Sequence, residues 1–290
     1  MAEPYLGNPL RCETVLRKFG FSFRKKFGQN FLIDSDVLEG IVDAAAVDEE
    51  DVVLEIGPGI GSLTQYLASR ARRVISVEID RALLPILDYT LADWDNVRII
   101  NNDILKTDIR AIAGEENGGR PLKVIANLPY YITTPIIMKL FENGAPISSV
   151  TVMVQKEVAD RLAAKPGSKA YGAITLAVQY YASVEPVIEV GPESFIPAPK
   201  VSSAVIRLNR YEEKPVTAAH EDILFKLIRG SFNQRRKTFV NGAANFEGLS
   251  YTKDDIRAAL AHAGLPESIR GEVMSLAEFA AVADYLGENS

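Results

Sequence analysis

The sequence predicts an α/β protein: a doubly wound, mostly parallel sheet of seven strands, followed by a small all-α domain. Short segments rich in β-branched residues alternate with segments of helical period over the first 210 residues. A glycine-rich turn follows the first of these β-rich segments, and no strand-like segment follows residue 210. Strand–helix alternation at this spacing is typical of doubly wound sheets.

The strand candidates are short apolar runs that end in polar or turn-forming residues. They are Val52–Ile56, Val74–Ile79, Val97–Ile100, Val124–Asn127, Val150–Val154, Val184–Val190 and Ser203–Leu208. The last two follow each other without an intervening helix, joined by residues 191–200. We therefore expect them to form an antiparallel pair at one end of the sheet.

Helical patterns lie between most of the strand candidates. The predicted helices are Ser35–Ala46, Leu63–Ser69, Ala82–Leu91, Thr134–Glu142, Lys156–Ala164 and Ala170–Tyr181. Gly118 and Gly119 indicate a surface loop before the fourth strand. Beyond a linker at 212–215, helical periods continue at 221–239, 253–263 and 276–286. We therefore expect a sheet domain at residues 1–210 and a helical domain at residues 211–290.

The composition excludes several classes of protein. The chain has 290 residues, 47% of them hydrophobic and 24% charged, which suits an ordinary globular protein. No apolar run reaches the ~18 residues of a membrane span, and the first residues lack the features of a secretory signal. Cys12 is the only cysteine, so neither an internal disulfide nor a zinc site with the two distant histidines can form. We expect no metal, a cytoplasmic location and a monomer.

The charge distribution is more informative than the net charge. The net charge of −6 argues mildly against a nucleic-acid partner. However, residues 1–30 contain six cations, Lys25 and Lys26 among them, against two acids. Residues 225–240 contain no acid at all, and their cations are Lys226, Arg229, Arg235, Arg236 and Lys237. One such run alone is most simply a solvated surface; two runs flanking the motifs below favour an RNA partner.

A glycine turn after the first strand predicts a nucleotide cofactor. Residues 52–56 lead into Gly57, Gly59 and Gly61, and glycines let the backbone approach a ligand closely. Glu78 ends the next strand, where a carboxylate can accept both hydroxyls of a ribose. Glu55 precedes the turn and would repel a pyrophosphate, whereas it suits the cationic methionine end of S-adenosylmethionine. The turn therefore favours S-adenosylmethionine over NAD, although a plain tight turn would also explain the glycines.

Asp103 follows the third strand and can accept a hydrogen bond from the amino group of the cofactor adenine. A helix N-cap is the simpler role for an aspartate at such a position.

The fourth strand ends in Asn127, Leu128, Pro129 and Tyr130, at the edge where open α/β sheets bind ligands. The exocyclic nitrogen of adenine is a poor nucleophile because its lone pair is delocalised into the ring. Two acceptors on its N–H groups, the Asn127 side-chain oxygen and the Leu128 carbonyl, can free that lone pair. Pro129 stiffens the turn and the Tyr130 ring can stack on the base. An ordinary turn into a helix is the alternative interpretation.

The loop between the last two strands is stiffened by two prolines. Phe195 can form the second wall of a base site opposite Tyr130, and Lys200 can meet a phosphate. The alternative is a rigid connection with Phe195 in the core.

Together these residues resemble the ribosomal RNA adenine dimethyltransferases of the KsgA type, over nearly the whole chain. Residues 25–32 are similar to the family's N-terminal cofactor motif, which implies that Asn30 and Leu32 contact S-adenosylmethionine. The resemblance implies further cofactor contacts at Gly57, Glu78, Asp103 and Asn127. Residues 195–205 are similar to the family's Phe-x-Pro-x-Pro-Lys-Val-x-Ser-Ala-Val segment, which supports a role for Phe195 at the substrate base.

The resemblance implies a Rossmann-like methyltransferase domain and a helical domain that contacts RNA. Its substrate would be two adjacent adenosines in a hairpin near the 3′ end of small-subunit (16S) ribosomal RNA, within a pre-ribosomal particle. Residues 231–238 and 275–279 favour this type over the antibiotic-resistance methylases of large-subunit RNA. A ribosome-assembly factor with incidental methylation is the third hypothesis.

Overall fold

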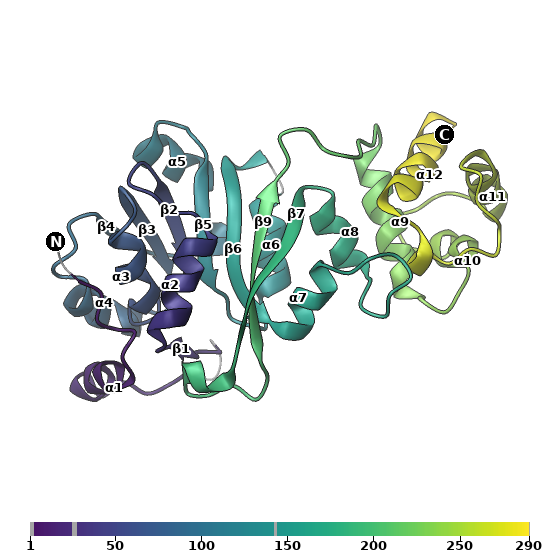
Figure 1. Cartoon of the computed structure of the whole chain (residues 1–290). Helices are drawn as coiled ribbons and strands as arrows, with labels where there is room; N and C mark the ends of the chain where they lie inside the picture. Colours follow the sequence, from purple (N-terminus) through teal and green to yellow (C-terminus); the bar gives the residue numbers. More distant parts are fainter. Residues whose placement is uncertain (1–2, 25–27, 142–143, 290) are drawn as a thin grey trace. The chain divides into compact units, whose positions relative to one another are not determined.

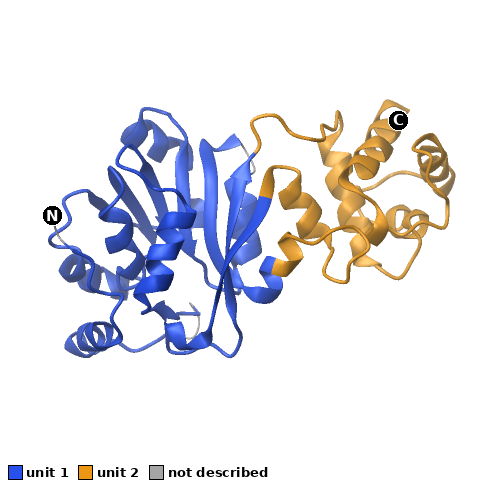
Figure 2. Cartoon of the chain, viewed as in Figure 1, with its two compact units in different colours: residues 1–159, 184–210 blue, residues 160–183, 211–290 orange. Residues whose placement is uncertain are grey.

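The computed structural model describes residues 3–24, 28–141 and 144–289. The chain divides into two compact units, one of residues 1–159 with 184–210 and one of residues 160–183 with 211–290 (Figure 2). The expected boundary after residue 210 occurs in this division, but residues 160–183 group with the helices rather than with the sheet. Tyr171, Leu176 and Tyr180 explain this assignment, because their side chains are buried in the core of the helical unit.

The first unit contains a seven-stranded sheet in the order β4-β3-β2-β5-β6-β9-β7 (Figure 1). Strands β2 to β6 pair in parallel, and β9 pairs with β6 in antiparallel orientation. The predicted α/β fold with a mostly parallel sheet is thus confirmed, and all seven strand candidates are strands. Their bounds are β2 Val52–Ile56, β3 Arg73–Glu78, β4 Val97–Asn101, β5 Leu122–Asn127, β6 Ile147–Gln155, β7 Ala182–Val190 and β9 Ser203–Arg210.

Helices of this unit connect the strands and cover the sheet. Val53, Val74 and Ile125 share one core cluster with side chains from α1 to α4. These strand residues lie on one face because successive side chains alternate across a strand. The helices are α1 Pro9–Lys18, α2 Ser35–Ala44, α3 Ser62–Ala68, α4 Leu84–Thr90, α5 Ile109–Asn117 and α6 Thr133–Phe141. Helix α7, Lys156–Leu162, begins in this unit and ends in the second.

Two helices of this unit were not predicted, although each carries local signals. Helix α1 begins after Asn8, whose side chain accepts from the next backbone amides, and Pro9 occupies its first turn. Helix α5 begins after Asp108, which caps it in the same way, and ends at Gly118 with a φ of 61°. Gly118 and Gly119 therefore end a helix and turn the chain toward β5.

A second, two-stranded sheet was also missed. Strand β1, Phe31–Leu32, pairs antiparallel with β8, Phe195–Ile196. Neither strand is long enough to show alternation in the sequence. The pairing joins the segment between α1 and α2 to the loop between β7 and β9.

The second unit is helical. It contains α8 Ala173–Gln179, α9 Glu221–Asn233, α10 Phe239–Ala244, α11 Lys253–His262 and α12 Leu276–Glu288. The single helix expected at 221–239 breaks after Asn233, because the Phe239 amide donates to the Ile269 carbonyl and a new helix starts there. Ile228, Phe239 and Phe279 lie in its core. Among the described residues, no helix is long and apolar enough to span a membrane.

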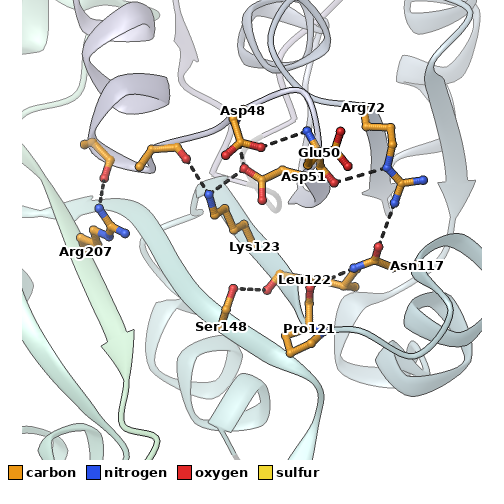
Figure 3. A network of polar contacts seen from close by, with 12 residues as sticks. Asp48, Glu50, Asp51, Arg72, Asn117, Pro121, Leu122, Lys123, Ser148 and Arg207 are labelled. Carbon is orange, nitrogen blue, oxygen red and sulfur yellow. Dashed lines mark hydrogen bonds and ion pairs between the residues drawn. The ribbon is translucent and has the colours of Figure 1, made fainter.

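A polar network lies at the amino ends of the sheet strands (Figure 3). Lys123 Nζ donates to Asp51 Oδ2 over 2.6 Å and also to the Ala46 carbonyl. Arg72 joins the Glu50 carbonyl to the Asn117 side chain. The network ties the loop before β2 to β5 and to the end of α5, at the edge of the sheet opposite the pocket described next.

Candidate functional site

A pocket lies at the carboxyl ends of β2, β3, β4 and β5, where an open parallel sheet binds its ligands. Its lining comes from five short segments, residues 28–32, 55–60, 77–79, 102–104 and 127–132, with a few side chains from α3, α6 and the short helix η2, Arg81–Leu83. Most of the predicted site residues meet here: Asn30, Leu32, Glu55, Gly57, Gly59, Glu78, Asp103, Asn127, Leu128, Pro129 and Tyr130. Gly61 and Phe195 do not line it.

The glycine turn gives the pocket its floor. Gly57 and Gly59 have φ values of 70° and 62°, which side chains rarely tolerate. A Cβ added to Gly59 would lie 2.9 Å from the Phe31 ring, so only glycine lets this turn and residues 28–32 come together. Gly61 has another role than the one predicted. It starts α3 with a φ of 91°, and a Cβ there would meet Thr90 Oγ1 at 3.0 Å.

Glu78 lies at the end of β3 with only 5% of its surface exposed. Its Oε1 accepts a hydrogen bond of 2.7 Å from the Asp80 amide, which orients the carboxylate. Burial raises the pKa of Glu78 to about 7. The group can thus accept hydrogen bonds from paired hydroxyls without a full charge at neutral pH.

Glu55 is almost fully buried, with 1% of its surface exposed. Its Oε2 accepts from Thr64 Oγ1 at 2.7 Å and from Ser76 Oγ at 2.6 Å. Burial raises the pKa of Glu55 to about 7, so the carboxylate is only partly ionised near neutral pH. Glu55 therefore repels a pyrophosphate less strongly than a fully ionised, exposed carboxylate would. An approaching cation would favour the ionised form of Glu55.

Asp103 caps a short helix and also lines the pocket. Its Oδ1 accepts from the Leu105 amide at 2.9 Å and so caps the short helix η3, Ile104–Lys106. The same residue lines the pocket next to Asn102 and Ile104.

Residues 28–32 form a wall of the pocket and are anchored at several points. Gln29 Nε2 donates to Asp80 Oδ2, and Arg24 Nη1 donates to Asp80 Oδ1, each at 2.9 Å. The Asp80 carboxylate is 1% exposed, so this anchor is shielded from water. Strand β1 then pairs with β8. Lys25 and Lys26, predicted to contact RNA, lie outside the described residues.

Asn127 is held by this same wall. Its Nδ2 donates to the Asn30 carbonyl at 3.1 Å, which fixes the amide with its nitrogen directed at the wall. The side-chain oxygen is thereby free to face a ligand. Leu128 is buried, and its amide donates to the Met153 carbonyl at 3.1 Å, so the tetrapeptide continues from the paired end of β5.

The Tyr130 ring is fixed through its hydroxyl. Tyr130 Oη and Ser203 Oγ form a hydrogen bond of 2.7 Å, and Ser203 is fully buried at the start of β9. Sequence reasoning did not single out Ser203, because a serine that starts a strand has no distinguishing local signal. Tyr131, at 61% exposed, also lines the pocket, and its ring lies beside Gly28 and Pro129.

Phe195 packs in the core and does not form a wall of the base site. It is 2% exposed and shares a cluster with Phe31 and Leu32, since β8 pairs with β1 at this point. Lys200, five residues on, is exposed as a phosphate contact requires. The alternative interpretation of this loop, a rigid connection with Phe195 in the core, describes the structure.

The sequence analysis missed the apolar residues that line the pocket, Ile79 and Ile104 among them. Ile79 directly follows Glu78 and is 49% exposed, and Ile104 directly follows Asp103. An exposed isoleucine beside a carboxylate at this edge suits the flat face of an aromatic ring. The signal was present in the sequence as an apolar residue after each acidic one.

The predicted cationic residues of the helical unit differ in their surroundings. Arg229, Arg236 and Lys237 are exposed. Arg235 instead donates to Glu272 and to two backbone carbonyls of its own unit. These three hydrogen bonds give Arg235 a role inside its own unit that the sequence did not indicate, while its side chain stays 38% exposed.

A comparison with models of protein families shows to which family the chain belongs. A model of the family described as "Ribosomal RNA adenine dimethylase" matches residues 20–279. The chain belongs to the ribosomal RNA adenine dimethylase family. Such methyltransferases in general use S-adenosylmethionine, which agrees with the glycine turn and the two buried carboxylates.

Curated relatives of this family match nearly end to end. The chain is 56% identical to ribosomal RNA small subunit methyltransferase A of Lachnoclostridium phytofermentans over 98% of both chains. It is 50% identical to the protein of the same name from Streptococcus pneumoniae, over 94% of this chain and 95% of the relative.

Two solved structures share the fold. A dimethyladenosine transferase from Plasmodium falciparum has a TM-score of 0.73 and 26% identity, covering 87% of this chain and 95% of that one. The 23S rRNA methyltransferase ErmE has a TM-score of 0.66 and 28% identity, covering 89% of this chain and 100% of that one. The relatives named for the small subunit are thus far more similar in sequence than the enzyme named for 23S RNA.

Proposed function

We propose that this enzyme transfers methyl groups from S-adenosylmethionine to the N6 amines of two adjacent adenosines in small-subunit ribosomal RNA. The target is a hairpin near the 3′ end of 16S RNA, and the reaction belongs to small-subunit biogenesis. The single observation that carries the proposal is the orientation of Asn127, whose amide nitrogen is held by Asn30.

The pocket fits S-adenosylmethionine at three points. Gly59 has no side chain at the point where its backbone approaches the Phe31 ring, so a ligand can lie against the glycine turn. The buried Glu78 carboxylate can accept the two ribose hydroxyls, and Ile79 with Ile104 offers an apolar slot for the adenine. When bound, the sulfonium supplies an activated methyl group, so a strong general base is not required.

The protein's task is to hold the acceptor amine. The Asn127 side-chain oxygen and the Leu128 carbonyl accept the two N–H hydrogens, which pulls the nitrogen toward tetrahedral geometry and frees its lone pair. Tyr130 supports the base face, and stacking of this kind contributes roughly 1–3 kcal/mol per base. Because the Tyr130 hydroxyl and the Asn127 amide are both anchored, the site is held in position before the base arrives.

The RNA is contacted outside the pocket by exposed cations. Lys200 lies on the loop before β9, and Arg229, Arg236 and Lys237 lie on the helical unit. Such residues bind phosphates and set orientation without reading bases. We place the reaction on a pre-ribosomal particle in the cytoplasm, with the enzyme acting as a monomer.

The test is Asn127→Ala, with methyl transfer and cofactor binding measured separately. We expect methylation of small-subunit particles to fall by at least 100-fold, while the Kd for S-adenosylmethionine changes by less than roughly tenfold, since one hydrogen bond is worth about 1 kcal/mol. Asn96→Ala is the matched control, because the Asn96 amide also donates to backbone carbonyls, those of Ala68 and Ala71. Normal methylation by Asn127→Ala would refute the proposed site.

A second experiment tests the substrate. Immature small subunits and large-subunit RNA that both lack the modification are incubated with the enzyme and labelled cofactor. Label in the small-subunit hairpin alone supports the proposal, whereas label in large-subunit RNA alone would favour an ErmE-like activity. If cells that lack the enzyme have a small-subunit assembly defect, and expression of Asn127→Ala restores assembly in full, the assembly-factor hypothesis is favoured.

A further inference from the structure

Tyr131 is an aromatic residue at the pocket to which the proposed reaction gives no role. Its side chain is 61% exposed, and among the described residues no aromatic side chain is more exposed. It nevertheless lines the pocket, directly after Tyr130. Tyrosine suits such a place because its ring is apolar and its hydroxyl can stay in water. An open ring at the edge of a binding pocket is available to a ligand that the pocket does not enclose.

The backbone around Tyr131 is a closed turn that leads into α6. The Ile132 amide donates to the Pro129 carbonyl at 3.2 Å, and Thr133 Oγ1 donates to the same carbonyl at 3.2 Å. The ring also lies beside the wall of residues 28–32, because a Cβ added to Gly28 would be 3.4 Å from Tyr131 Cδ1. The ring is therefore in place before a ligand arrives, which lowers the entropy that binding costs.

The strand order places Tyr131 at the end of the pocket where the methyl acceptor is held. Asp103 follows β4, Glu78 ends β3 and the glycine turn follows β2, so the proposed cofactor contacts occupy three successive strand ends. The next strand in the sheet is β5, which ends at Asn127, the proposed acceptor of the amine hydrogens. Tyr131 comes between this strand end and α6. Its position thus favours a contact with the RNA over a contact with the cofactor.

Two adjacent adenosines give this open ring a specific ligand. A stacked base reaches an active site only after it is flipped out of the strand, which costs its stacking energy. Flipping one adenosine also uncovers a face of the other, and the covalent backbone keeps that neighbour at the mouth of the pocket. Tyr130 is anchored through Ser203 for the base inside the pocket, whereas the exposed Tyr131 ring can cover the uncovered face.

We propose that the Tyr131 ring stacks on the adenosine next to the one being methylated, and so takes the place of the base that has been flipped into the pocket. The inference rests on the proposed function, because it takes two adjacent adenosines of the RNA as its ligand. The stacked neighbour holds the strand at the mouth of the pocket while Asn127 holds the amine of the flipped base. Tyr131 thereby favours targets whose neighbour is a base with a large aromatic face.

The test combines a change in the protein with a change in the RNA. The kcat/KM for methylation is measured on small-subunit particles assembled with intact 16S RNA, and on particles in which each of the two adenosines in turn is abasic. On intact particles Tyr131→Ala should lose roughly 5–150-fold, the worth of one base–aromatic stack, whereas Tyr131→Phe keeps the ring and should lose less than about twofold. When the stacking neighbour is abasic, Tyr131→Ala should differ from the wild type by less than about twofold, because there is no base to stack.

Tyr89→Ala is the matched control, since Tyr89 in α4 of the same unit is 47% exposed and lies outside the pocket lining. It should leave kcat/KM unchanged. If Tyr131→Ala loses as much on both kinds of abasic particle as on intact ones, the ring does not act on the neighbouring base and the inference is wrong. An equal rise in the Kd for S-adenosylmethionine would also overturn it, because the ring would then act through Gly28 and the wall of the cofactor pocket.

The failure of this inference is distinct from the failure of the proposed function. Methylation of intact particles by Tyr131→Ala at the wild-type rate refutes the stacking role and leaves the proposed function intact. Absence of methylation by the wild type on intact particles refutes the proposed function, and the inference with it.

Discussion

The hydrogen bond between Tyr130 and Ser203 predicts that a residue outside the pocket controls capture of the target base. Ser203 is buried, and its hydroxyl is 2.7 Å from that of Tyr130. Tyr130→Phe keeps the ring and removes the hydroxyl; Ser203→Ala keeps the tyrosine and removes its partner. Either change frees the ring to leave the orientation that a stacked base needs.

The magnitude follows from the bond and from the stacking it supports. A neutral hydrogen bond contributes about 1 kcal/mol, which is roughly fivefold in kcat/KM. We expect each single variant to lose about fivefold in kcat/KM for the RNA, and the double variant to lose little more than either, a coupling of about 1 kcal/mol. Tyr130→Ala, which also loses the stacking, should lose roughly 5–150-fold more.

The assay is single-turnover methylation of small-subunit particles, with the Kd for S-adenosylmethionine and the thermal midpoint measured beside it. Ser202→Ala is the matched control, since Ser202 is the exposed neighbour of Ser203. If the losses of Tyr130→Phe and Ser203→Ala simply multiply in the double variant, the two hydroxyls act independently and the reasoning is wrong. Equal losses in cofactor affinity would also contradict it, because they would indicate a general disturbance of the sheet.

Three further predictions concern stability and the cofactor. Burial raises the pKa of Glu55 to about 7, so the folded protein binds a proton there more tightly than the unfolded chain, and stability falls as the pH rises from about 4.5 to 7. Glu55→Gln should remove about 3 kcal/mol of that loss, measured as the difference between urea unfolding free energies at pH 5 and pH 8. The contribution of Glu78, whose pKa is also raised to about 7, should remain in the variant. Gly59→Ala should abolish measurable cofactor binding in calorimetry, because the φ of Gly59 is 62° and the Phe31 ring is too near for a Cβ. The control is Gly114→Ala in α5, where a Cβ meets no atom within 4 Å. This variant should retain cofactor binding and gain about 0.4–1 kcal/mol in the free energy of unfolding. Lys123→Met should cost about 1–3 kcal/mol in unfolding free energy without changing kcat, whereas Arg70→Met, which breaks the exposed pair with Asp43, should cost less than about 1 kcal/mol.

The sequence predicted well what local patterns determine. The seven strands follow from β-branched composition, and β2 agrees with its prediction residue for residue. Gly57, Glu78, Asp103 and Asn127 meet in one pocket because each lies at, or within two residues after, the carboxyl end of a strand of the parallel sheet, so the topology alone brings them to one edge.

The features that the sequence did not predict depend mostly on contacts between distant segments. Phe195 is buried because its strand pairs with Leu32, a partner 163 positions away that no local pattern indicates. Arg235 is used internally because it meets carbonyls 66 and 67 residues earlier in the chain. Gly61 was assigned to the cofactor by its spacing, whereas its φ of 91° and the nearby Thr90 hydroxyl give it a role in helix packing.

The hydrogen bond from Asn127 to the Asn30 carbonyl also determines which hydrogen-bonding groups the pocket presents to a base. With the amide nitrogen turned toward the Asn30 carbonyl, the side chain presents its oxygen to a base, and the Leu128 carbonyl offers lone pairs as well. Guanine or hypoxanthine would place a carbonyl oxygen where adenine places its amine, so that oxygen would face oxygen with no hydrogen between them. Sites built around a donor group of the substrate reject analogues that lack it by roughly 10⁴–10⁵-fold. An adenosine that has been deaminated to inosine is therefore refused by the same two acceptors that hold the correct base.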